Sequence, residues 1–183
     1  KLIDWHNIDN NQFHFTEELV VQNAEGTGNR IPDIVCFVNG LPLVVIEAKR
    51  SDSNKEGKST NAEAISQHIR NQGQAEIPHL YAYSQLLLAV NGHEGLYATC
   101  GIPEKFWAKW KEEQIHEAEF VRLKNHKLSD EQLNGLFNHR PAKAKDDYLS
   151  LVAAGDLTVT DQDRLIVSLL RPERLLDMTR LFT

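Results

Sequence analysis

Cysteine is scarce in this chain, since its 183 residues include only Cys36 and Cys100. No histidine cluster accompanies them, and two separated cysteines do not supply the ligands of a structural zinc site. Both lie in apolar, strand-like segments, which favours reduced thiols inside the protein over a disulfide. The scarcity therefore argues against a zinc module and favours the cytoplasm.

Long apolar runs are also missing. No segment approaches the roughly 20 apolar residues of a membrane-spanning helix, and no signal peptide is visible at Lys1. Apolar residues follow at once, with Leu2, Ile3 and Trp5, so we expect an excised fragment of a longer protein whose N-terminal part is truncated.

Positive charge is in deficit, with a formal net charge of −6 at pH 7. A free-standing protein that holds DNA tightly usually carries a basic patch, so this balance argues against one. It does not exclude a nuclease, because catalytic carboxylates add negative charge and the grip on DNA can lie elsewhere in a larger assembly.

Short apolar runs separated by turn residues predict a sheet. Asn39-Gly40 is a strong hairpin-turn signal, and residues 43–46 are apolar without alternation, as expected for a strand buried on both faces. The strand-like segments are residues 13–21, 33–38, 43–48, 85–90 and 96–100.

Helical patterns accompany the predicted strands. Thr60 and Glu63 form a capping-box pattern that opens a helix to about residue 72. A polar loop at residues 50–60 precedes it, and we expect this loop to be mobile and protease-sensitive. Residues 78–83 are predicted to form one or two further turns.

Aromatic residues gather in the next helical pattern, at residues 103–110. The spacing of Phe106, Trp107 and Trp110 favours a packing face over a surface that stacks on bases. Beyond residue 111 the chain becomes rich in charge, and helical periodicity returns from Asp161 and again from Pro172. The layout is a mixed sheet with helices, followed by a helical tail.

Two carboxylates and a lysine stand in a pattern that suits phosphodiester hydrolysis. Pro32-Asp33 precedes the tripeptide Glu47-Ala48-Lys49 at the end of an apolar strand. Mg²⁺ prefers carboxylate and water oxygens, and a bound metal polarises phosphate and lowers the pKa of its water. A nearby lysine can orient that water or stabilise the developing charge.

The spacing alone leaves a second interpretation open, in which Glu47 and Lys49 form an ion pair at the sheet edge and Asp33 merely begins a strand. The tripeptide pattern is weak by itself, since residues 56–58 repeat it in a polar loop. Context favours the first copy as functional, because charges that end an apolar strand are disfavoured unless they are paired or used.

A segment of twenty residues carries a resemblance to a known family. Residues 30–49 read RIPDIVCFVNGLPLVVIEAK. They are similar to the signature of the N-terminal nuclease domain of type I restriction enzyme R subunits, within the PD-(D/E)xK nuclease superfamily. The likeness continues through IPHLYAYSQLLLAVNG at residues 77–92 and covers about residues 1–111. Residues 169–182 resemble, more weakly, the helical lead-in to the motor domains of such subunits.

The resemblance implies an α/β fold, a restriction-endonuclease-like mixed β-sheet flanked by helices with a C-terminal helical extension. Residues 1–111 would form the nuclease core, and residues 112–183 a mostly helical extension toward motor domains. Asp33 and Glu47 would bind Mg²⁺ together with the backbone carbonyl of Ala48, and Lys49 would assist the attacking water.

The family also carries a glutamine-x-x-x-tyrosine motif on the helix after the lysine. Gln67 matches the glutamine, which implies a catalytic role, whereas Asn71 stands in place of the tyrosine. Ala48 stands where a bulkier aliphatic residue is usual. His68 could face the site, but we expect it on the surface.

The function implied is a Mg²⁺-dependent endonuclease domain of a type I site-specific deoxyribonuclease, which hydrolyses double-stranded DNA. Its partners would be the methyltransferase and specificity subunits and the motor domains of the same parent chain. ATP would be used only in domains outside this chain. The alternative is a catalytically silent assembly or DNA-contact module that keeps the fold, which the acidic balance and Asn71 leave open.

Residues 57–59 (GKS) resemble the end of a phosphate-binding loop. A full motif needs glycine at the position of Asp52, and no strand leads into the segment. We therefore expect no nucleotide site here.

Strand parity makes the metal site testable. A plain two-residue loop at Asn39-Gly40 would turn the Asp33 side chain away from Glu47, because a one-residue slip moves every side chain to the other face. We therefore predict a three-residue loop, residues 39–41, or an equivalent bulge, with Gly40 at positive φ and Asp33 opposite Glu47.

Overall fold

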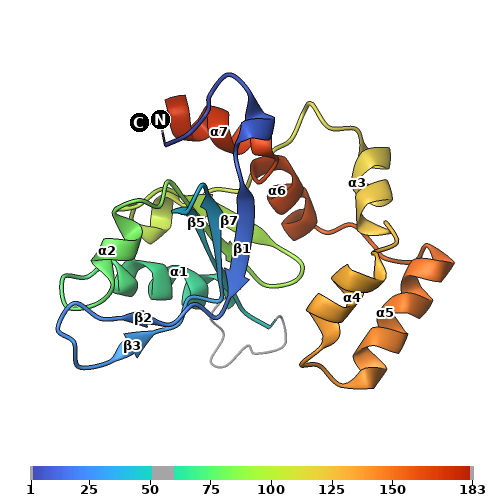
Figure 1. The fold of residues 1–183 in the computed structure, drawn as a ribbon, viewed down its shortest axis with the longest axis horizontal. Helices are drawn as coiled ribbons and strands as arrows, with labels where there is room; N and C mark the ends of the chain where they lie inside the picture. Colours follow the sequence, from blue (N-terminus) through green and yellow to red (C-terminus); the bar gives the residue numbers. More distant parts are fainter. Residues whose placement is uncertain (1, 51–59, 182–183) are drawn as a thin grey trace.

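The structure is a computed structural model that describes residues 2–50 and 60–181. Within them, five strands form one mixed sheet in the order β1-β4-β5-β6-β7 (Figure 1). β5 and β6 are parallel, and the other neighbours are antiparallel. The strands are β1 (Phe13–Glu17), β4 (Ile34–Val38), β5 (Leu41–Ala48), β6 (Leu86–Val90) and β7 (Gly95–Ala98). A separate ribbon pairs β2 (Val21–Gln22) with β3 (Asn29–Arg30).

Helices complete the fold on both sides of this sheet. Parallel strands need a crossover connection, and the chain between β5 and β6 supplies it with α1 and α2. α1 begins at Thr60, as predicted, and α7 has proline as its first residue, which is the favoured place for proline in a helix. The helical elements are η1 (Ile8–Asn10), α1 (Thr60–Asn71), α2 (Pro78–Tyr81), η2 (Glu104–Phe106), α3 (Glu117–Lys124), α4 (Asp130–Phe137), α5 (Ala142–Ala154), α6 (Asp161–Leu169) and α7 (Pro172–Leu181).

Two hydrophobic clusters lie on the opposite faces of the sheet. Val44 and Ile46 of β5 join the first, with Leu165 and Leu169 of α6. Val45 joins the second, with apolar residues of α1 and α2. The central strand is therefore buried on both faces, as its unbroken apolar run predicts. This arrangement confirms the predicted α/β mixed sheet flanked by helices.

The last two helices are part of the packing against the sheet. Leu165, Leu169, Leu175 and Leu176 are all buried in the first cluster. The boundary at residue 111 stays a prediction, but the chain beyond it contributes to the core that supports β5 and β6.

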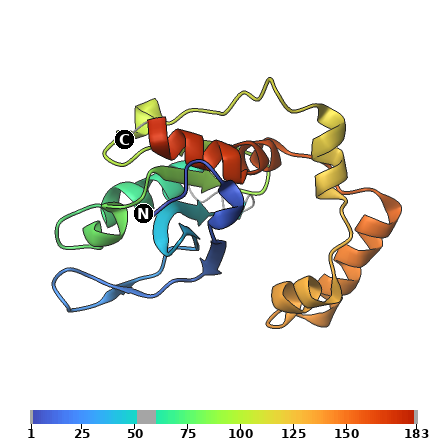
Figure 2. The same cartoon turned by 45° about the horizontal axis from the view of Figure 1, so that its top comes forward.

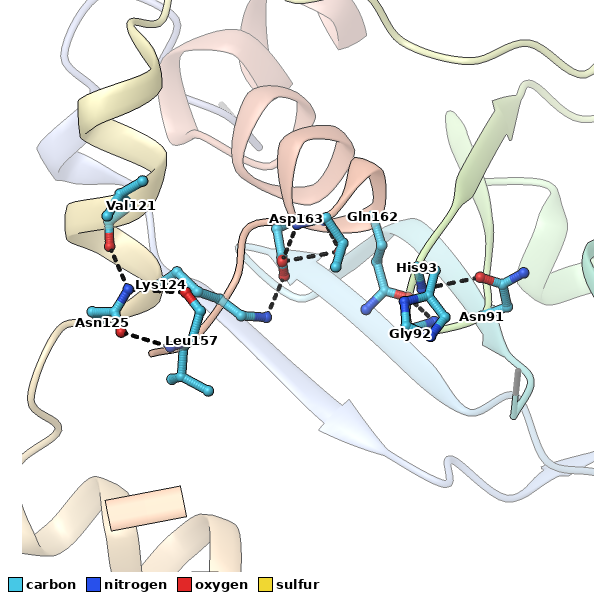
Figure 3. Close-up of polar contacts among 10 residues, drawn as sticks. Asn91, Gly92, His93, Val121, Lys124, Asn125, Leu157, Gln162 and Asp163 are labelled. Atoms are coloured by element: carbon cyan, nitrogen blue, oxygen red, sulfur yellow. Dashed lines mark hydrogen bonds and ion pairs between the residues drawn. The ribbon is translucent and has the colours of Figure 1, made fainter. Parts of the chain in front are cut away.

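Helices α4 and α5 stand apart from the sheet (Figures 1 and 2). Two reciprocal hydrogen bonds join a residue that precedes α4 to the segment that follows α5. Asn125 Nδ2 donates to the Leu157 carbonyl (3.0 Å), and Leu157 N donates to Asn125 Oδ1 (3.1 Å) (Figure 3). Lys124 Nζ lies 2.7 Å from Asp163 Oδ1 and joins α3 to α6. Gln162 accepts a 2.6 Å hydrogen bond from Gly92 N in the β6–β7 turn. These contacts anchor the start of α6 to the sheet and to α3.

The β4–β5 hairpin differs in detail from the prediction. Val38 pairs with Leu41, so the loop has two residues and not three. Asn39 and Gly40 both have positive φ, 51° and 83°, which is the geometry of a type I′ turn. A bulge restores the register, because Phe37 pairs with Pro42 while Cys36 pairs with Val44, which leaves Leu43 as the extra residue. The predicted equivalent bulge and the positive φ of Gly40 are confirmed.

The prediction of a helix at residues 103–110 is wrong. Only Glu104–Phe106 form a short 3-10 turn, and Trp107 is extended with φ −66° and ψ 133°. The aromatic residues therefore separate: Trp107 packs on the α1 side of the sheet, Trp110 on the α6 side, and Phe106 is exposed.

Three remaining expectations concern thiols, membranes and the polar loop. Cys36 and Cys100 are free and half-buried, as expected. In the described ranges, no helix is both long and apolar enough to span a bilayer. The loop and the GKS segment lie almost wholly at residues 51–59, outside the described residues.

Candidate active site

The bulge in β5 brings two carboxylates together. Ile34 pairs with Ile46, and extending this register by one residue places Asp33 opposite Glu47, on one face of the sheet. The Asp33 carbonyl accepts a 2.9 Å hydrogen bond from Glu18 N, which fixes the backbone at the start of β4. Asp33 Oδ2 accepts a 2.7 Å hydrogen bond from Ala48 N. Asp33, Glu47 and Ala48 therefore meet at the end of β5.

Glu47 is wholly buried, with 0% of its surface exposed. Oε1 receives a long contact from Asn71 Nδ2 at 3.5 Å. Oε2 receives no hydrogen bond from a donor among the described residues. Burial, then the negative charge of Asp33 and a hydrogen bond shared with the Asp33 side chain, raise the Glu47 pKa to about 8, while the charges of Lys49 and Arg70 oppose the rise. A buried carboxylate with an unpartnered oxygen is an environment that favours a bound cation.

Lys49 lies on the same side of β5 as Glu47 by strand parity. Its backbone N donates to the Val90 carbonyl at 2.8 Å, which continues the parallel pairing with β6. Its charge lowers the Glu47 pKa. The structure thus brings Asp33, Glu47 and Ala48 together, and Lys49 follows them directly in the chain.

Gln67 lies on α1, one turn before Asn71. It is half-buried, and its Oε1 is buried without a hydrogen-bond partner in the described part of the chain. No described contact joins Gln67 to Asp33 or Glu47. Its catalytic role stays a prediction.

His68 is buried, with 0% exposure, and the prediction of a surface histidine is wrong. Nε2 lies 2.9 Å from the Leu88 carbonyl and Nδ1 lies 3.2 Å from the Tyr81 hydroxyl. Burial lowers the His68 pKa to about 4, so the ring is neutral near pH 7. A carbonyl can only accept, so Nε2 carries the proton and Nδ1 accepts from Tyr81. This pair fixes α1 to β6 and to α2.

Asn71 completes the polar layer under the site. It is 1% exposed, and its Oδ1 accepts hydrogen bonds from Arg70 Nε at 3.2 Å and Nη2 at 3.1 Å. The sequence identified this position only as a departure from a family motif. The signal that it points inward was available, because Ala64, His68 and Asn71 recur at the three- and four-residue spacing of one helix face.

The donor set decides which metal the site fits. Within the described residues, no group of three or more His, Cys, Asp or Glu is placed to hold a metal ion. Two carboxylates and the backbone at Ala48 are too few for a closed zinc site, which needs four ligands. Mg²⁺ keeps several waters and takes one or two carboxylates together with substrate phosphates. Asp33 and Glu47, with an unpartnered buried oxygen between strands, therefore fit Mg²⁺.

Comparison with known proteins identifies the family. The family model described as "Type I restriction enzyme R protein N terminus" matches residues 1–106. The chain belongs to this family. The resemblance found in residues 30–49 and 77–92 is confirmed.

Similar proteins are named as endonuclease subunits of type I restriction enzymes. The chain is 38% identical over 143 residues to a Methanocaldococcus jannaschii protein named as the candidate endonuclease subunit of the type I restriction enzyme MjaVIIIP. It is 33% identical over 112 residues to the type I restriction enzyme HindI endonuclease subunit of Haemophilus influenzae. These matches cover 75% and 61% of this chain. They span only 13% and 10% of the two relatives. No solved structure matches the chain significantly.

Proposed function

We propose that this chain is a Mg²⁺-dependent endonuclease domain that hydrolyses phosphodiester bonds of double-stranded DNA within a type I restriction enzyme. The observation that carries the proposal is the pairing of Asp33 with a buried Glu47 whose Oε2 receives no hydrogen bond from a donor in the described chain. Relatives named as endonuclease subunits support it. A sheet-edge ion pair between Glu47 and Lys49 would not need the bulge that turns Asp33 to the same face.

Each residue has a distinct task in this proposal. Asp33 and Glu47, with the carbonyl of Ala48, would hold Mg²⁺, which polarises the scissile phosphate and lowers the pKa of its water. The amide of Ala48 holds the Asp33 carboxylate in place at 2.7 Å. Lys49 would orient the attacking water or stabilise the charge that develops on phosphate. Gln67 is the remaining candidate, one helical turn before Asn71.

The surrounding assembly would supply recognition and movement. The net charge of −6 opposes the phosphates, so we assign sequence recognition to the specificity subunit and translocation to motor domains of the parent chain. The methyltransferase subunit would complete a cytoplasmic restriction complex. ATP would be used only by domains outside this chain.

The intact parent complex provides the test of activity. Asp33→Ala, Glu47→Ala and Lys49→Ala should each abolish DNA cleavage but spare ATP hydrolysis and translocation, because these residues serve the metal site. Glu63→Gln, at an exposed position on α1, keeps the capping-box pattern; it is the control and should cleave normally. Wild-type cleavage by the three site variants would refute the assignment. A wild-type complex that translocates without cleaving would favour the silent module.

Metal binding is tested separately on the isolated chain. Calorimetric titration with Mg²⁺ should show binding to the wild type and none to Asp33→Ala. Equal heats for both proteins would place the metal elsewhere.

A further inference from the structure

We propose that Asn71 is a positioning residue of the metal site, whose amide holds Glu47 by Oε1 and leaves Oε2 to the cation. The inference rests on the proposed function, because it assigns Asn71 a role toward the same cation. It adds a buried residue of α1 to carboxylates that lie at the start of β4 and the end of β5.

The contact with Glu47 is the first step. Asn71 Nδ2 lies 3.5 Å from Glu47 Oε1, and both side chains are buried, at 1% and 0% exposure. Hydrogen bonds in a catalytic site are often long before substrate is bound and shorten afterwards. A donor on one carboxylate oxygen restricts rotation of the group, so the second oxygen, Oε2, keeps a fixed direction.

Arg70 decides which end of the amide faces the carboxylate. An asparagine amide can turn over, and the network around it determines the orientation. The Arg70 guanidinium donates twice to Asn71 Oδ1, at 3.2 and 3.1 Å, and a guanidinium cannot accept. The donor end, Nδ2, must therefore point to Glu47. If the amide were reversed, its NH2 group would face the two guanidinium donors of Arg70, and Arg70 would lose both hydrogen bonds.

The backbone at Asn71 adds rigidity to this arrangement. The Asn71 carbonyl accepts a 3.1 Å hydrogen bond from Ile77 N, just before α2, and Ile77 is fully buried. Groups that orient a metal ligand in this way typically change metal affinity by about 10- to 100-fold when they are removed. Asn71 has the position and the chemistry of such a group.

The experiment measures Mn²⁺ binding to the full 183-residue chain by calorimetry and by electron paramagnetic resonance of the bound ion. Asn71→Leu keeps a similar volume and removes the donor. We expect its Mn²⁺ dissociation constant to rise about tenfold, with an altered Mn²⁺ spectrum at saturation. Thermal unfolding and circular dichroism establish that the variant is folded.

The chain offers a matched control in Asn61→Leu. Asn61 is also a buried asparagine of α1, at 2% exposure, but it lies ten residues away along the sequence, about 15 Å along the helix. Asn61→Leu should leave Mn²⁺ affinity and spectrum unchanged. An equal loss in both variants would mean that any buried polar deletion in α1 loosens the site, and would overturn the inference.

Arg70→Met keeps the proposal falsifiable if Asn71→Leu does not fold, because Arg70 is exposed. Removing a positive charge near Glu47 should by itself tighten cation binding. The measurement is made at about 0.5 M salt, where the direct effect of the Arg70 charge on the cation is largely screened. If Arg70 sets the orientation of the Asn71 amide, Mn²⁺ binding to Arg70→Met should weaken severalfold under these conditions. Tighter or unchanged binding would overturn the inference.

The outcomes separate this inference from the proposed function. A wild-type chain that binds no Mn²⁺ overturns both. Wild-type binding retained in Asn71→Leu, together with loss in Asp33→Ala, overturns the role of Asn71 and leaves the metal site standing.

Discussion

Replacement of Glu47 by glutamine should make the metal-free protein more stable. Burial and the charge of Asp33 raise the pKa of the Glu47 carboxyl from its ordinary value of 4.5 to about 8. The folded state therefore binds this proton more tightly than the unfolded state, and stability falls as the pH rises from about 4.5 to 8. Each pH unit between these values costs about 1.4 kcal/mol, which gives about 3 kcal/mol at pH 7.

Glu47→Gln removes this loss because its side chain stays neutral at every pH. The amide can accept from Asn71 and donate toward Asp33, so it fits the polar neighbours that are present. At pH 7 the melting temperature should rise by up to roughly 6–12 °C for a chain of this size. Near pH 4 the two proteins should be nearly equal in stability.

Thermal and urea unfolding with a chelator, from pH 4 to pH 8, measure this difference. Glu63→Gln, an exposed change on α1, is the control and should follow the wild type. Addition of Mg²⁺ should raise the wild-type melting temperature, since a ligand that binds only the folded state stabilises it, and should not affect Glu47→Gln. A variant less stable than the wild type at pH 8, or equally stable throughout, would refute the reasoning.

Two further predictions concern packing and DNA. Gly95→Ala should destabilise the fold by about 1–3 kcal/mol, because the added Cβ would lie 2.5 Å from Cδ2 of the buried Leu165. Chemical denaturation measures the loss, and the double variant with Leu165→Ala should show a non-additive recovery. An unchanged midpoint would contradict a tight contact between Gly95 and Leu165. The isolated chain should bind DNA weakly, with little sequence preference and a strong dependence on salt; fluorescence anisotropy at several ionic strengths checks this, and tight, site-specific binding at physiological salt would contradict it.

The sheet was predictable because its signals are local. An unbroken apolar run at residues 43–46 predicts a strand covered on both faces, and α6 and α1 do cover it. The false helix at residues 103–110 shows the limit of such patterns. Trp107 and Trp110 are spaced for one helix face, but they pack on opposite faces of the sheet, and burial of each ring is satisfied better by an extended segment that passes the sheet edge.

The polar layer under the site was less predictable for a physical reason. A buried histidine is stable only if both ring nitrogens find partners, and those of His68 come from Leu88 and Tyr81, which are distant in the sequence. Nothing local to His68 specifies them. The helical spacing of Ala64, His68 and Asn71 could have indicated an inward face, but not which carboxylate it meets.

The β4–β5 hairpin combines a strong turn signal with the geometry that the proposed site needs. Asn39-Gly40 is a strong type I′ sequence and forms the two-residue turn that local chemistry favours. That turn alone would place the Asp33 and Glu47 side chains on opposite faces. Leu43 resolves the conflict, because one extra residue in β5 reverses the parity of every position beyond it. A hairpin without the bulge would satisfy the turn and the hydrophobic pattern equally well near the loop. The bulge places Asp33 opposite Glu47, which is the arrangement that the proposed site needs if both carboxylates are to act on one ion.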